Sequence, residues 1–173
     1  MDTFIRVVRW LSRVTGVAAA LLIALAVLVI CDMVVERYML HHTTIWQIDV
    51  VTYSIVGATF IGSPYVLLHR GHVNVDILPL HSGPRFRYWL ALFTMVLSAA
   101  FCVVLFVLTS QYWYEAWSQN WKSDTVWRAR LWIPLLSMPV GLGLLVLQYA
   151  AEILAVVTGR TPPFGMTAYE EVA

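Results

Sequence analysis

Five histidines are the residues in this chain whose chemistry most readily suggests a bound group: His41, His42, His69, His72 and His81. Imidazoles that face each other inside a helix bundle can ligate haem, and the three-residue spacing of His69 and His72 suits a metal. All five, however, lie in loops or at the ends of apolar segments, and on opposite sides of them. Only Asp76 adds a nearby carboxylate. The pattern argues against metal or haem, and a haem-binding membrane anchor of a respiratory enzyme is the alternative function.

Nucleophilic and redox chemistry lack the residues that they need. The two cysteines, Cys31 and Cys102, each lie in an apolar run, where a thiol behaves as a small hydrophobic group. A membrane enzyme that forms disulfides would need paired cysteines in its outward-facing loops. No nucleophile–base pattern and no glycine loop that cradles phosphate is present. The sequence therefore predicts no active site and no cofactor, and the net charge of +1 gives no indication of a nucleic-acid partner.

The polar residues within the apolar segments lie near the segment ends. Asp32 lies near the outer end of the first segment, and Glu36 comes close behind it. Asp49 opens the second segment, and Gln148 and Glu152 are one helical turn apart near the end of the last. Each position suits an interfacial charge or a contact with another helix. Coupling ions and polar substrates need ligands near the middle of the bilayer, so we do not expect this chain to form a transport pathway alone.

Composition shows which elements must position these residues. Of the 173 residues 60% are hydrophobic and 12% are charged, and the mean hydropathy is +0.75. Soluble domains are about one-quarter charged. Four apolar segments each hold roughly 20 residues or more, enough for a helix to cross a bilayer. We predict an all-α membrane protein in a single domain, residues 1–173, with spans at about 14–35, 48–68, 88–110 and 131–157.

The segment before the first span has two interpretations. Arg6, Arg9 and Arg13 share one face of a helix, and apolar side chains occupy the opposite face. This pattern is typical of an amphipathic helix that lies in the membrane interface. It is equally that of a straight extension of the first span, whose arginines reach the headgroups.

The distribution of basic residues predicts the orientation. Seven of the 11 Lys and Arg residues lie at the two termini and in the middle loop, and the other four lie in the two opposite loops. Cytoplasmic loops carry the excess of positive charge in membrane proteins. We therefore expect both termini in the cytoplasm.

Small residues and prolines mark places where helices can approach each other. Ala58 and Gly62 have the small-xxx-small spacing, and Gly57 adjoins them. Gly141 and Gly143 form a similar notch in the last span. Three prolines can kink their helices and expose carbonyl groups: Pro64, Pro134 and Pro139. The partner helix could belong to this chain or to another membrane subunit.

Aromatic residues gather at the outer end of the third span. Trp113, Trp117 and Trp121 recur every four residues, and Trp127 and Trp132 follow. An interfacial aromatic belt explains them, on a helix that could extend beyond the bilayer. A docking surface for an external protein is the second interpretation.

The second and fourth spans resemble a known family in several short motifs. They are Trp46-x-x-Asp49, Gly57-Ala58 with Gly62, the run from His69-Arg70-Gly71-His72 to Asp76, and Leu131-x-Ile133-Pro134 with Met138-Pro139-Val140-Gly141. Together with the size and the four spans, they resemble the small Q-type (DctQ-like) subunit of tripartite ATP-independent periplasmic (TRAP) transporters. The chain departs from that pattern at Ser63-Pro64 and in the density of its tryptophans.

The resemblance implies a function and partners. TRAP transporters take up organic acids, typically carboxylates, using a gradient of sodium or another cation across the bacterial inner membrane. A periplasmic solute-binding protein delivers the solute, and a large transmembrane subunit carries the substrate and ion sites. The small subunit would scaffold the large one. By this resemblance Asp49 lies near the solute-binding protein or the outer rim, whereas Arg70, His72 and Asp76 lie at the cytoplasmic end. There His72 and Asp76 would hold the turn between the second and third spans.

Overall fold

A computed structural model describes residues 2–69 and 84–158. Five helices form in chain order: α1 (Asp2–Tyr38), α2 (Gln47–Leu68), α3 (Pro84–Ser118), α4 (Trp132–Leu135) and α5 (Ser137–Val157). Four stretches are long and apolar enough to cross a membrane, since α4 and α5 together make one of them. The all-α membrane fold predicted from composition is confirmed.

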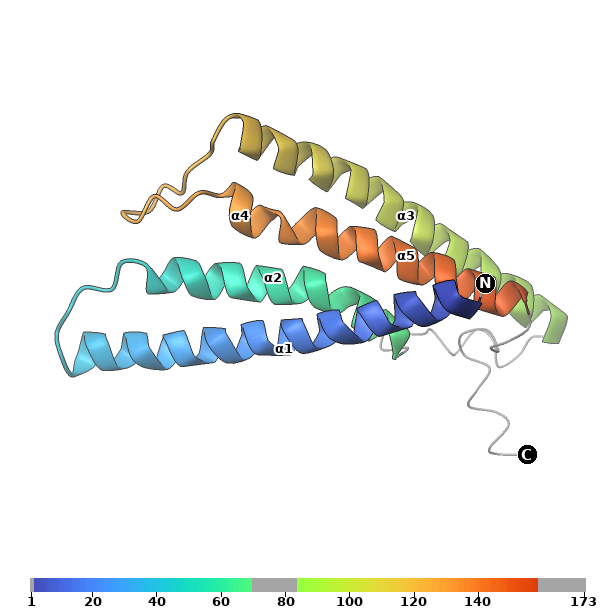
Figure 1. Cartoon of the computed structure of the whole chain (residues 1–173), viewed down its shortest axis with the longest axis horizontal. Helices are drawn as coiled ribbons and strands as arrows, with labels where there is room; N and C mark the ends of the chain where they lie inside the picture. The colour runs from blue at the N-terminus through green and yellow to red at the C-terminus, as the bar shows by residue number, and fades with distance from the viewer. Residues whose placement is uncertain (1, 70–83, 159–173) are drawn as a thin grey trace.

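The helices lie in two antiparallel pairs, α1 with α2 and α3 with α5 (Figure 1). Helix α5 joins the pairs because it contacts both α2 and α3, and also packs against α1. The pairs diverge toward the end that carries α4 and converge toward the end that carries the N-terminus (Figure 1). The packed apolar centre lies around α5, where Leu142, Leu145 and Tyr149 meet Leu67 and Cys102.

Helix α1 decides between the two interpretations of the N-terminal segment. It continues without interruption from Asp2 to Tyr38. The segment before the first span is therefore a straight extension, and the separate interfacial helix is not formed. Ile5, Val8 and Ser12 of this extension are buried. Packing against the bundle thus holds the extension in line with the span.

Helix α3 continues to Ser118, eight residues beyond the predicted end of the third span. It stops where Asn120 adopts a left-handed backbone conformation with φ 51°. There the amide of Trp121 donates to the carbonyl of Ala116, and the amide of Asn120 donates to that of Trp117. These are the two hydrogen bonds of a Schellman motif, and asparagine tolerates the required conformation. The aromatic repeat thus lies on a helix that is longer than hydropathy indicates.

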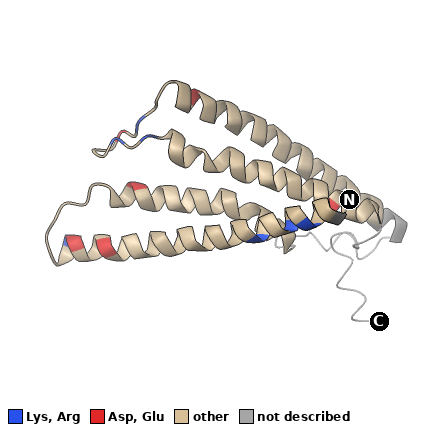
Figure 2. Cartoon of the chain, in the orientation of Figure 1, with Lys and Arg blue, Asp and Glu red and all other residues tan. Residues whose placement is uncertain are grey.

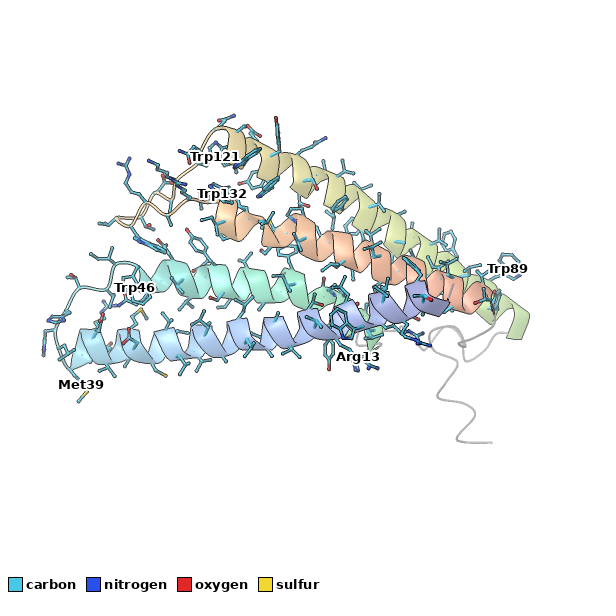
Figure 3. All side chains as sticks on the ribbon, viewed as in Figure 1. Arg13, Met39, Trp46, Trp89, Trp121 and Trp132 are labelled. Carbon is cyan, nitrogen blue, oxygen red and sulfur yellow. The ribbon has the colours of Figure 1, made fainter. Side chains whose placement is uncertain are left out.

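A short hairpin connects α3 to α4. Lys122 and Arg130 form an antiparallel bridge, and the amide of Ser123 donates to the carbonyl of Ala129 over 2.8 Å. Its turn closes where Arg128, with φ 50°, donates its amide to the carbonyl of Thr125. Figure 3 shows Trp121 and Trp132 at the two ends of this connection. These contacts fix the shape of the connection between α3 and α4.

Candidate functional site

The end of the bundle that carries α4 is the one that the basic residues predict to be the outer end. It is held by a hydrogen bond that spans 76 residues. The Thr125 hydroxyl, in the hairpin, donates to Oδ2 of Asp49 over 2.5 Å. Asp49 is in the first turn of α2 and is only 7% exposed. A carboxylate is favoured there by the helix dipole, and the hydroxyl partly replaces its lost water. Asp49, predicted for the outer rim, thus connects the hairpin to α2.

A second contact ties α1 to the start of α2. Nε2 of Gln47 donates to Oε2 of Glu36 over 2.6 Å. The Gln47 side chain is 1% exposed, and its Oε1 atom is buried without a hydrogen-bond partner among the described residues. The sequence drew attention to Glu36 but not to Gln47. The sequence feature that could have identified Gln47 is a polar side chain at the start of an apolar segment.

The end that carries the N-terminus, predicted to be the inner end, is held by a chain of four side chains between α1 and α5. The Ser12 hydroxyl donates to Oε1 of Gln148 over 2.8 Å, and Nε2 of Gln148 donates to Oε1 of Glu152 over 3.0 Å. Nη2 of Arg9 lies 3.8 Å from the same carboxylate oxygen. Gln148 is fully buried and Glu152 nearly so. The paired polar groups expected from their one-turn spacing therefore face α1 of the same chain.

The glycines mark where helices of this chain approach each other. A β-carbon at Gly57 would lie 3.3 Å from Cδ1 of Leu22, and one at Gly62 would lie 3.0 Å from Cβ of Ala19. Both neighbours belong to α1. A β-carbon at Gly141 would collide with the backbone carbonyl of Phe60 in α2. These three glycines serve packing inside the bundle.

The prolines have different local effects. Pro64 is buried within a continuous α2, whereas Pro134 lies in the short α4, which Leu136 separates from α5. Pro139 is buried in the first turn of α5, where a missing amide hydrogen costs little. The break therefore falls between the two last prolines. Arg70, His72 and Asp76 lie outside the described residues.

The aromatic residues at the outer end contact one another. Trp113 and Trp117 stack with their ring centroids 5.9 Å apart, and Nε1 of Trp113 donates to the carbonyl of Trp132 over 3.1 Å. Tyr112 meets Trp121 edge to face at 5.5 Å. At the hairpin tip, Val126 is 82% exposed and Trp127 is 46% exposed. The cluster joins α3 to α4 and leaves an apolar tip uncovered.

Charged side chains gather at the two ends of the bundle and leave its middle free among residues 2–69 and 84–158 (Figure 2). In the same part of the chain, no three His, Cys, Asp or Glu side chains come close enough together to hold a metal. His69 contacts Tyr65, with ring centroids 4.2 Å apart. The described polar groups hold helices together, and the class they define is a multi-pass helical membrane protein.

Comparison with known proteins gives the family. The family model for tripartite ATP-independent periplasmic transporters, DctQ component, matches residues 26–159, most of the chain. The chain belongs to this family, as its motifs indicated. It is thus a TRAP transporter subunit of the bacterial inner membrane and not an enzyme, which decides against the haem-binding anchor.

One relative is the C4-dicarboxylate TRAP transporter small permease protein DctQ of Vibrio cholerae. It is 20% identical over 148 residues, which cover 73% of this chain and 64% of that protein. The chain therefore matches somewhat less than two-thirds of the relative's length.

Proposed function

We propose that this chain scaffolds the large transmembrane subunit of a TRAP transporter that takes up organic acids, with carboxylates as the solute class. The support for the solute is the name of the Vibrio cholerae relative, a C4-dicarboxylate small permease. A cation gradient, with sodium as the expected ion, would drive uptake. The solute and ion sites would lie in the large subunit.

The observation that carries the scaffold role is the position of the charged residues. Along α2 no Asp, Glu, Lys or Arg follows Asp49, and along α5 none precedes Glu152. Each of these two carboxylates is engaged by another part of the same chain. Polar solutes and coupling ions need ligands near the middle of the membrane. A chain without them is suited to support a transport subunit.

The same proposal includes the orientation of this chain in the membrane and its second partner, the solute-binding protein. The arginines at the start of α1 lie at the end of the bundle where α5 finishes, and the hairpin lies at the other end (Figure 2). The excess of positive charge favours the cytoplasm for the first of these ends. The exposed hairpin tip would then face the periplasm, where the solute-binding protein delivers its ligand.

Reconstitution tests the proposal. Vesicles that contain the large subunit, with solute-binding protein outside, are measured for uptake of a labelled C4-dicarboxylate under an inward sodium gradient. We expect uptake only when this chain is also present. Uptake at the full rate in its absence would contradict the scaffold role. A Trp127→Ser variant with normal assembly but reduced uptake would support docking at the hairpin tip.

A further inference from the structure

Helix α2 carries a narrow exposed stripe along its whole length. Its residues follow one another at alternating steps of four and three: Ile48, Thr52, Ile55, Thr59, Gly62 and Val66. Gly62 is partly covered by Ala19 of α1, and the other five are exposed. Outside these six residues, all of α2 except Tyr65 is half-buried or buried. We call these six residues the α2 stripe.

The spacing of the α2 stripe is that of a helix–helix seam. Steps of four and three residues average 3.5, the repeat with which two helices keep knobs of one in holes of the other. From Ile48 to Val66 the stripe covers about 27 Å at 1.5 Å per residue. That length is close to the hydrocarbon thickness of a bilayer, about 30 Å. Another spanning helix would match it from end to end.

The side chains of the α2 stripe are those of a protein contact. It holds glycine, two threonines and three β-branched apolar residues, which are small or stiff and lose little freedom on packing. Each threonine hydroxyl donates to the carbonyl four residues earlier over 2.9 Å, Thr52 to Ile48 and Thr59 to Ile55. The stripe therefore presents methyl groups and needs no polar partner.

A comparison of the four spans indicates whether protein or lipid lies against the exposed face of α2. The α2 span is the least hydropathic of the four, yet only 33% of its most apolar window is buried. The α1 and α3 windows are the most hydropathic and are 22% and 12% buried. The exposed surface of α3 is broad and bulky, as at Phe93, Leu97 and Phe101. Lipid suits that surface, whereas the modest hydropathy of α2 fits burial in an assembled complex.

We propose that the α2 stripe is the seam along which a transmembrane helix of the large transporter subunit packs. This inference rests on the proposed function, which supplies a membrane partner in the same complex. The stripe is also continuous with packing inside the chain, because Gly62 at its edge already contacts α1. A helix on the stripe would thereby be held close to both helices of the first pair.

Photo-crosslinking tests the seam with little disturbance of folding. p-Benzoylphenylalanine is placed at position 55 or 59 in the complex of this chain with its large subunit. Matched controls carry it at positions 97 or 104 of α3, where Leu97 and Val104 are 58% and 55% exposed. We expect crosslinks to the large subunit from α2 and at least about tenfold fewer from α3. Equal yields from both helices, crosslinks to a second copy of this chain, or adducts with lipid alone at positions 55 and 59 would overturn the inference.

A substitution pair gives a second measurement. Ile55→Trp places a bulky group in the seam, and Val104→Trp adds the same group to the lipid-facing side of α3, at sites of similar exposure. We expect about tenfold less large subunit to co-purify with the first variant and no change with the second. If the Ile55→Trp variant co-purifies with as much large subunit as the parent does, the seam is overturned but the proposed function is not. If the parent itself recovers no large subunit, the proposed function fails and the seam fails with it.

Discussion

The backbone carbonyl of Phe60 in α2 lies against Gly141 of α5, where a β-carbon would collide with it. Pro64 has no amide hydrogen to offer this carbonyl, and the Ser63 hydroxyl donates to it instead over 2.8 Å. Ser63-Pro64, which departs from the family pattern, therefore shapes the place where α5 crosses α2. This crossing helps to join the two helix pairs.

Substitution of Gly141 tests that crossing. We expect Gly141→Ala to destabilise the folded chain by about 1–3 kcal/mol, because the added methyl group must displace the α2 backbone. Gly143→Ala is the matched control, since its β-carbon would lie 3.1 Å from the edge of the Phe106 ring, which can shift. The measurement is the midpoint of unfolding by sodium dodecyl sulfate in mild detergent. Equal midpoints for the two variants would contradict the close α2–α5 approach.

Removal of the Thr125 hydroxyl tests the connection at the outer end. In Thr125→Val the buried Asp49 carboxylate loses the donor that lies 2.5 Å away. We expect a loss of about 2 kcal/mol in the free energy of unfolding, as for other hydrogen bonds to charged groups. Thr125→Ser keeps the hydroxyl and should remain close to the parent. If serine and valine lower the unfolding midpoint equally, the hydrogen bond does not stabilise the fold.

The polar chain at the inner end gives a third prediction. Glu152→Ala leaves the Gln148 amide and the Arg9 guanidinium without their shared carboxylate. We expect a cost of about 1–2 kcal/mol, the range found for polar contacts between helices in model membrane peptides. Glu115→Ala is the control, because Glu115 is exposed and its carboxylate accepts from Gln119, one turn away on the same helix. Loss of stability in the control equal to that of Glu152→Ala would mean that the α1–α5 link contributes nothing specific.

The orientation can be measured independently of the partners. Green fluorescent protein fused after Ala173 should fluoresce, because it folds in the cytoplasm and fails to do so when exported unfolded. Alkaline phosphatase inserted in the loop at residues 39–46 should be active, since this enzyme needs the periplasm to form its disulfides. The opposite pair of results would invert the orientation inferred from the basic residues.

Much of the fold could be predicted because lipid imposes a simple constraint on sequence. Only helices and closed barrels can cross a bilayer, and a run of about 20 apolar residues has the length and pattern of a helix, so the spans are visible directly. The predicted second span, residues 48–68, differs from α2 by one residue at its start. Hydropathy underestimated α3 because Tyr112 to Trp117 are amphipathic and reduce the average, although they continue the helix to Ser118.

Contacts between distant residues could not be predicted in the same way. Nothing in the sequence distinguishes Thr125 from other loop threonines, and only the hairpin brings it to Asp49. In the same way, Ser12 meets Gln148 only because α1 begins before the predicted start of the first span. A single sequence carries periodicity along each helix but not the register between helices. For Gly57, Gly62 and Gly141 the sequence indicated close approach but left open which helix approaches.

The most direct test of the central claim is co-purification. The parent chain is expressed with the large membrane subunit of its transporter, extracted in mild detergent and purified by a tag on this chain alone. We predict a stable complex of the two proteins, recovered in constant ratio through size-exclusion chromatography and identified by mass spectrometry. Recovery of this chain by itself, monomeric or self-associated, while the large subunit is present and folded in the same membranes, would contradict its role as a scaffold.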